Sequence, residues 1–180
     1  MNDVKDWLAG EVAAWITSER DKFRPQGAKI DQDDLTILSK YFTPDVLNRA
    51  AMVRGVDLTD PPFYPQLIDR GFKSLPPFSK MYAVTFNDTI AISRQADTLD
   101  VSAWLGLLVH ELAHVEQFRR LGVQEFARIY VASYLRELEY SRIILENHAS
   151  SVEIAFLASE QPFSASDHLD TLMSGLSKHY

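Results

Sequence analysis

The feature that most constrains this 180-residue chain is a helical pattern that begins near Val101 and carries His-Glu-x-x-His in its middle. Apolar residues recur there on nearly every face of the helix, which predicts a central, buried element. Thr98 or Asp100 can cap its start, and Gly122 follows its last apolar turn, where a left-handed residue is expected. Three titratable side chains stand inside this apolar pattern. Because unpaired polar groups are costly to bury, they must have partners in the fold or hold a ligand.

His110 and His114 are four residues apart, so their side chains lie on the same face of the helix. Zinc binds imidazole nitrogens in tetrahedral sites, and two histidines at this spacing can reach one ion. Glu111 is rotated by about 100° from His110, where it can touch water without binding the metal. The pattern therefore predicts a Zn2+ site with Glu111 as general base for metal-assisted hydrolysis. The plain alternative is that these residues serve packing or solubility only.

A catalytic zinc site needs a third protein ligand, and the sequence narrows the choice. The chain has no cysteine that could bind the metal. Downstream of His114, the positions at which metzincins carry a further histidine ligand hold Phe118 and Arg120 instead. A carboxylate on a later helix is favoured, and Glu153 is the first choice because Ala155 beside it leaves space. Ser150-x-x-Glu153 also fits a capping box, in which Glu153 caps only its own helix. The remaining candidates are Glu146, and after it His148, Glu137 and Glu139.

The other patterns predict an α+β fold that is mostly helical. Helices are expected over residues 1–30, 33–42, 124–146, 151–159 and 165–178, with a break at 147–150, and a short helix is expected to start at Pro44. Residues 50–58 fit a strand, and residues 60–78 form a proline-rich loop. Residues 81–94 fit either a hairpin that turns at Asn87 and Asp88 or one long strand. This small β-segment is expected to pack beside the His-Glu-x-x-His helix.

The length fits one domain over residues 1–180, with an N-terminal amphipathic helix in 1–30, a core in 31–160 and a C-terminal helix in 161–180. The net charge of −7 argues against nucleic acid as a partner. No signal peptide is visible and no apolar stretch is long enough to cross a bilayer. With no cysteine either, the sequence predicts a cytoplasmic protein, and it gives no oligomeric state.

Three tyrosines on the next helix, Tyr130, Tyr134 and Tyr140, are candidates for a hydroxyl that stabilises an oxyanion, although each also fits an aromatic core position. Gly106 in mid-helix costs about 0.5–1 kcal/mol relative to alanine, which predicts a close approach of backbone or substrate there. The strand within 82–93 offers a free edge to which an extended peptide could add.

The motif and its surroundings resemble the small bacterial zincins of the gluzincin type. The resemblance rests on "HELAHVEQFRRLG", the preceding "AVTFNDTIAIS" and the following "ENHASSVEIAF", and it runs from about Thr36 to Ser159. It is closest to uncharacterised metallopeptidase domains with a His-Glu-Leu-x-His-Val-x-Gln motif. It implies a zincin-like, minimal gluzincin core, zinc held by His110 and His114, and Glu111 as base. It also implies a third ligand from a short motif of Glu and Ala, which Glu153 and Ala155 match loosely.

Two functions follow as hypotheses. The first is a zinc metallopeptidase that hydrolyses a peptide or protein substrate, including a form dedicated to one protein partner. The second is a non-catalytic zinc-binding or protein-interaction domain in which the motif is vestigial. They differ at Glu111, which only the first one needs.

Overall fold

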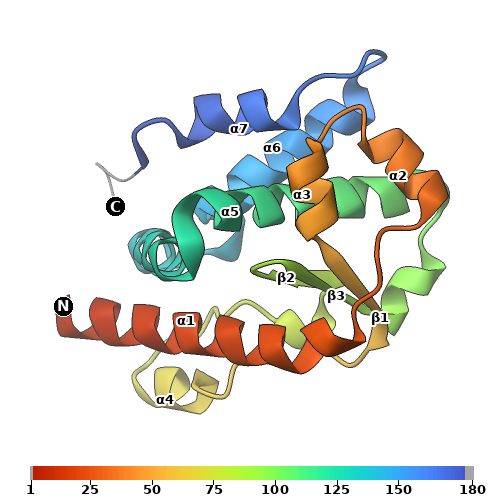
Figure 1. Ribbon diagram of the computed structural model, residues 1–180. Coiled ribbons are helices and arrows are strands. Elements are labelled where there is room, and N and C mark those ends of the chain that lie inside the picture. The colour runs from red at the N-terminus through yellow and green to blue at the C-terminus, as the bar shows by residue number, and fades with distance from the viewer. Residues whose placement is uncertain (1, 177–180) are drawn as a thin grey trace.

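The computed structural model describes residues 2–176, which form a mostly helical α+β fold around a three-stranded sheet (Figure 1). Its strands are β1 (Ala51–Val56), β2 (Ala83–Phe86) and β3 (Thr89–Ser93). Its α-helices are α1 (Asn2–Phe23), α2 (Gln32–Leu38), α3 (Pro44–Arg49), α4 (Tyr64–Asp69), α5 (Val101–Glu137), α6 (Ile144–Ala158) and α7 (Ala165–Met173). The expected α+β class, mostly helical and with a small β-segment beside the His-Glu-x-x-His helix, is confirmed, whereas the zincin-like core stays a prediction.

The β-segment of residues 81–94 is a hairpin, so the alternative of one long strand is wrong. Asn87 takes a positive φ of 59°, as a tight two-residue turn requires. β1 pairs with β3 in parallel, which gives the order β1-β3-β2 and leaves β2 at an edge. Arg20 of α1 fixes the turn, because its Nε and Nη2 donate to the two carboxylate oxygens of Asp88 at 2.9 and 3.1 Å.

α5 consists of two helical halves that meet at Gly122. Its first turn is capped by the side chain of Asp100, which accepts a hydrogen bond from the Ala103 amide at 2.9 Å. Gly122 lies at φ 72° and ψ 165°, so the left-handed residue predicted there is confirmed. The chain changes direction at this point and starts the second half at once (Figure 1). The first half carries the His-Glu-x-x-His motif.

The break after α5 lies earlier than predicted. The helix ends at Glu137, and Leu138 takes a left-handed φ of 54°, followed by a 3-10 turn over Tyr140–Arg142. The expected helix over 124–146 and the break at 147–150 are therefore wrong, because residues 147–150 lie inside α6. The capping box at Ser150 is wrong for the same reason. The predicted C-terminal helix is shorter, and its last residues, 177–180, lie outside the described part.

The first half of α5 lies between the sheet and the pair α6 and α7, and α1 runs below the sheet in the view of Figure 1. Two apolar clusters hold these elements together. One cluster joins α5 to α3, α6, α7 and the sheet, through side chains such as Leu112, Ile90 and Val152. The other joins α1 to the second half of α5, which confirms the apolar stripe of the first helix at Leu8 and Ile16. No helix within residues 2–176 combines the length and the apolar composition that a bilayer crossing needs.

Candidate metal centre

His110 and His114 lie one turn apart on α5 and point the same ring nitrogen into one space. Their Nε2 atoms are 3.1 Å apart, and the rings meet at an interplanar angle of 74°. His114 is buried, with 6% of its surface exposed. Two ring nitrogens this close in a buried place must share either a proton or a bound cation, because two facing lone pairs would repel each other.

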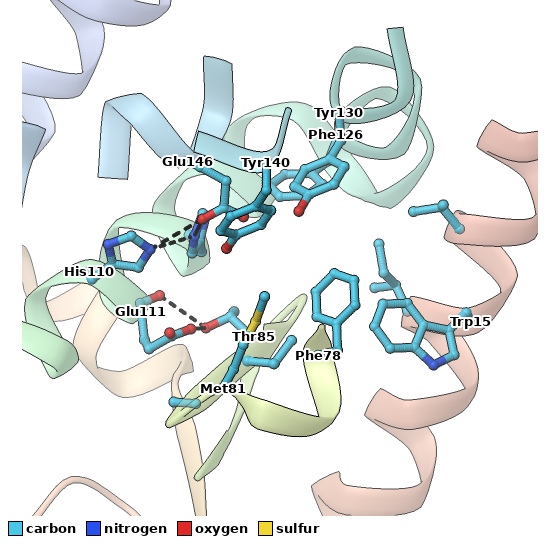
Figure 2. Close-up of a pocket in the computed structure, with 15 residues that line it drawn as sticks. Trp15, Phe78, Met81, Thr85, His110, Glu111, Phe126, Tyr130, Tyr140 and Glu146 are labelled. Carbon is cyan, nitrogen blue, oxygen red and sulfur yellow. Dashed lines mark hydrogen bonds and ion pairs between the residues drawn. The ribbon is translucent and has the colours of Figure 1, made fainter. Parts of the chain in front are cut away.

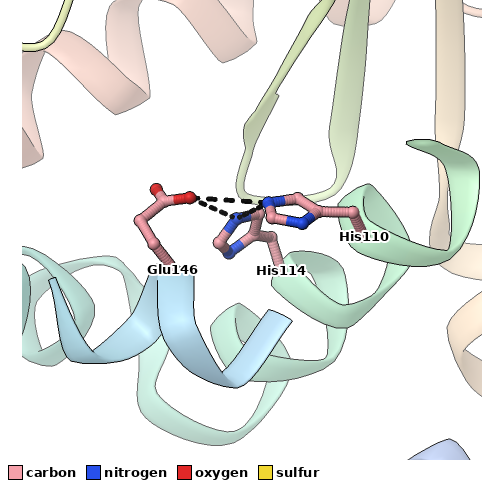
Figure 3. A group of neighbouring side chains, drawn as sticks. All are labelled: His110, His114 and Glu146. Atoms are coloured by element: carbon pink, nitrogen blue, oxygen red, sulfur yellow. Dashed lines mark hydrogen bonds and ion pairs between the residues drawn. The ribbon is translucent and has the colours of Figure 1, made fainter. Parts of the chain in front are cut away.

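Glu146 of α6 completes the group. Its Oε2 lies 3.4 Å from the Nε2 of His110 and 3.4 Å from the Nε2 of His114, as Figure 3 shows. The three atoms thus form a triangle with sides of 3.1, 3.4 and 3.4 Å. Ligand atoms about 2.0–2.1 Å from zinc at tetrahedral angles lie about 3.3–3.4 Å apart. The donor set and its spacing therefore fit a divalent cation, and these residues are the one metal-binding group found within residues 2–176.

The other nitrogen of each ring is held by a further side chain. The Nδ1 of His110 lies 3.1 Å from Oε2 of Glu153, and the Nδ1 of His114 lies 2.8 Å from Oε1 of Gln117. Gln117 in turn donates to the carbonyl oxygen of Leu145 at 2.9 Å, next to Glu146. Partners of this kind fix the tautomer of a metal-binding histidine, so that Nδ1 carries the proton and Nε2 faces the metal.

Charge in this cluster favours a cation. Burial lowers the pKa of His110, but the carboxylates of Glu146 and Glu153 outweigh it and raise that pKa to about 10. Burial likewise raises the pKa of Glu146, while His114 and His110 pull it well below the ordinary value. In the protein without metal, a proton on His110 is held strongly. This proton stands in for the positive charge that a metal would bring.

Glu111 faces the same pocket from the β2 side. Its Oε2 accepts a hydrogen bond of 2.6 Å from the hydroxyl of Thr85, which also lies 3.2 Å from the Glu111 carbonyl oxygen (Figure 2). The side chain is buried, with 4% exposed. The sequence analysis did not single out Thr85. The sequence signal that could have found Thr85 is a polar residue between the apolar Val84 and Phe86, in a strand that is otherwise apolar.

The pocket beside these residues has a volume of about 60 Å³. Besides the metal group it is lined by Ala83, Val84 and Thr85 of the edge strand, and by aromatic and aliphatic side chains of α1, α5 and the loop before β2. Tyr130 and Tyr140 also line it, whereas Tyr134 donates its hydroxyl to the carbonyl oxygen of Ser74 at 3.1 Å and lies outside. The buried hydroxyl of Tyr130 has no hydrogen-bond partner among the described residues. Figure 2 shows both hydroxyls turned toward the pocket.

Of the third-ligand candidates, the structure brings Glu146 and not Glu153 to the Nε2 atoms. Glu153 lies against the outer nitrogen of His110, where it orients the ring. A Cβ on Gly106 would lie 3.4 Å from Oε1 of Glu153, so the atoms that approach closely there are side chains of α6 and not the backbone or substrate that was predicted. The other candidates lie elsewhere: His148 is buried but outside the pocket, and Glu137 and Glu139 pair with arginines.

Comparison with known proteins returned no match. The chain fits no protein-family model, and neither a curated protein nor a solved structure is detectably similar to it. The resemblance to the gluzincin-type domains therefore rests on the sequence motif alone. What can be said of function comes from the metal group, Glu111 and the pocket that they share.

Proposed function

We propose that this protein is a zinc-dependent peptidase in which His110, His114 and Glu146 hold the metal. The carrying observation is the triangle of two imidazole nitrogens and one carboxylate oxygen, with a second carboxylate, that of Glu111, lining the same pocket. A site of two histidines and one glutamate leaves a coordination position open, which is typical of catalytic and not of structural zinc.

A zinc ion at this position would lower the pKa of a bound water toward about 7 and polarise the carbonyl group of a peptide. Glu111 supplies the base: its carboxylate takes a proton from water and delivers it to the leaving amine. Thr85 holds one carboxylate oxygen and so aims the other. The unpaired hydroxyl of Tyr130 is placed to donate a hydrogen bond to the carbonyl oxygen as that oxygen gains negative charge.

One observation favours the second candidate, a zinc-binding domain without catalysis. The pocket volume of about 60 Å³ holds one or two water molecules and not a peptide. A catalytic role therefore requires the walls of the pocket to move when substrate arrives. Both candidates bind the metal, so metal content alone does not separate them.

The test is a single substitution, Glu111→Gln, in protein reconstituted with zinc. We expect one zinc per chain in both forms by atomic emission, and loss of peptide cleavage by about 10³-fold or more, since a positioned base contributes about 10²–10⁴-fold. A library of fluorescence-quenched peptides serves as substrate. Glu139→Gln, at a carboxylate outside the pocket, is the matched control and should cleave like the parent protein.

Three outcomes are informative. Cleavage by the parent and control but not by Glu111→Gln supports the peptidase. Stoichiometric zinc with no cleavage by any form favours the non-catalytic domain. A chain that retains no zinc after reconstitution overturns both.

A further inference from the structure

A second cavity lies directly behind the metal-side pocket. It has a volume of about 40 Å³ and exposes only apolar atoms. Four residues line both cavities and so form the wall between them: Val12, Trp15, Phe78 and Tyr130. Protein interiors are packed with few voids, and an apolar void costs stability. A void retained beside a candidate catalytic centre is therefore best explained by a ligand that uses it.

The rear cavity is built to stay apolar. Its polar neighbours turn their hydroxyls outward: Tyr64 donates to the carbonyl oxygen of Pro76 at 2.7 Å, and Tyr134 to that of Ser74. These bonds also hold the loop before β2 over the cavity. What remains inside are aliphatic and aromatic surfaces contributed by α1, α4, this loop and the second half of α5.

The wall between the cavities has one fixed and one movable part. Trp15 is buried on α1, with 8% exposed, and its ring centroid lies 4.8 Å from that of Phe78. Phe78 is half-buried on a single 3-10 turn, Phe78–Lys80, whose other residues are exposed. Figure 2 shows its ring between Met81 and Trp15, on the side of the pocket away from His110. A small displacement of Phe78 would join the two cavities.

We propose that the joined cavities form a subsite for an aliphatic side chain of the substrate, so that the substrates are peptides with leucine, isoleucine or methionine next to the cleaved bond. This inference rests on the proposed peptidase function. The rear cavity supplies about 40 Å³ of apolar space, whereas an apolar cavity of about 150 Å³ is known to hold benzene. The space thus suits a branched or flexible aliphatic chain better than an aromatic ring.

The experiment measures binding instead of turnover. Two zinc-chelating dipeptide hydroxamates, one with a leucyl and one with a glycyl side chain beside the hydroxamate, are titrated calorimetrically into zinc-loaded protein. We expect the leucyl compound to bind at least tenfold tighter, since one methylene in an apolar pocket is worth about 10–200-fold. Leu75→Phe, which fills the rear cavity from the loop, should abolish most of this ratio. Leu135→Phe, a half-buried leucine that lines neither cavity, should keep it.

Equal affinity of the two compounds for the parent protein would overturn the subsite while leaving the zinc site intact. Binding of neither compound to zinc-loaded protein would overturn both. Two further measurements keep the proposal testable if a variant does not fold or if the protein does not take up zinc. Phe78→Ala should raise affinity for a phenylalanyl hydroxamate. Xenon at the rear cavity in a pressurised crystal, without any metal, would support the void, and its absence there would overturn it.

Discussion

Two buried carboxylates near the middle of the molecule, Glu116 and Glu146, differ in how their charge is compensated. Glu116 is fully buried and accepts hydrogen bonds from Arg119 at 2.6 and 2.9 Å and from Arg120 at 2.7 Å, with the hydroxyl of Ser166 at 3.2 Å. The two guanidinium groups that compensate the charge of Glu116 belong to the protein itself, so this site needs no bound ion. This network ties α5 to α7.

Glu146 meets imidazoles instead. Its ion pairs run to His110 and His114, and His110 is shared with a second carboxylate, Glu153, while Glu111 faces the same pocket. Imidazoles become positive only by holding protons, so this cluster is short of fixed positive charge. The contrast teaches that burial of a carboxylate is not in itself a sign of function. Charge compensated by arginine stabilises a fold, whereas charge left to histidine invites a metal.

The largest effect that would sharpen this contrast concerns metal affinity. Glu146→Gln should weaken zinc binding by about 10²–10³-fold, because it removes one of three protein ligands, and structural zinc sites with four protein ligands bind with about 10–16 kcal/mol in total, or about 2.5–4 kcal/mol per ligand. Glu153→Gln should cost only about 10–100-fold, because it removes a partner of a ligand. Glu116→Gln should leave affinity unchanged. Competition with a chelating dye measures all three constants. A larger loss for Glu153→Gln than for Glu146→Gln would return Glu153 to the ligand position.

The next effect concerns Tyr130. Tyr130→Phe should lower kcat by about 10²–10³-fold, the cost of one oxyanion donor, with little change in KM or zinc affinity. It should also raise thermal stability slightly, because it removes a buried hydroxyl without a partner. Tyr134→Phe is the control: it loses the bond to Ser74, so stability should fall by about 1 kcal/mol while kcat stays within a fewfold. An unchanged kcat in Tyr130→Phe would show that this hydroxyl does not stabilise the oxyanion.

Local sequence signals predicted the parts of the fold that local physics decides. The apolar pattern after Val101 and the glycine at Gly122 each specify a conformation within a few residues, and the structure follows them. The pattern of residues 81–94 left a hairpin and one long strand open, and the structure shows the hairpin. His110 and His114 share a helix, so their convergence could be read from spacing alone. The parallel pairing of β1 with β3 could not, because it joins segments distant in sequence.

The sequence favoured Glu153 over Glu146 as the third ligand because the predicted helix boundary differs from the one in the structure. Leu138 ends α5 in a left-handed conformation, which a leucine side chain gives no reason to expect. With the break set at 147–150, Glu146 fell at the end of one helix and Glu153 at the start of the next. In the structure Glu146 sits in the first turn of α6 instead, three residues before the fully buried Ala149. The sequence signal for Glu146 was a glutamate followed three residues later by a small residue, Ala149, at a place where two helices pack.

The smallest effect is the response of the arginine-compensated site to acid. Burial raises the pKa of Glu116, but hydrogen bonds from Arg119 and Arg120 outweigh it and hold that pKa below 4.5. A carboxyl whose folded pKa is lowered stabilises the fold above its unfolded pKa, and this contribution is lost as pH falls through the folded value. At pH 7, Glu116→Gln should lower the free energy of unfolding by about 2 kcal/mol, less than a fully buried pair because both arginines are partly exposed.

The stability difference between the parent protein and Glu116→Gln should therefore stay constant from pH 8 down to about 5.5 and shrink as the pH falls below 4.5. Urea unfolding of metal-free protein at each pH measures it, so that loss of zinc in acid does not enter. Glu160→Gln, at an exposed carboxylate, is the control and should track the parent throughout. Parallel curves for Glu116→Gln and the parent down to pH 3 would mean that the pKa of Glu116 is the same in the folded and unfolded states. The contrast between a carboxylate compensated by arginine and one compensated by histidine would then not hold for Glu116.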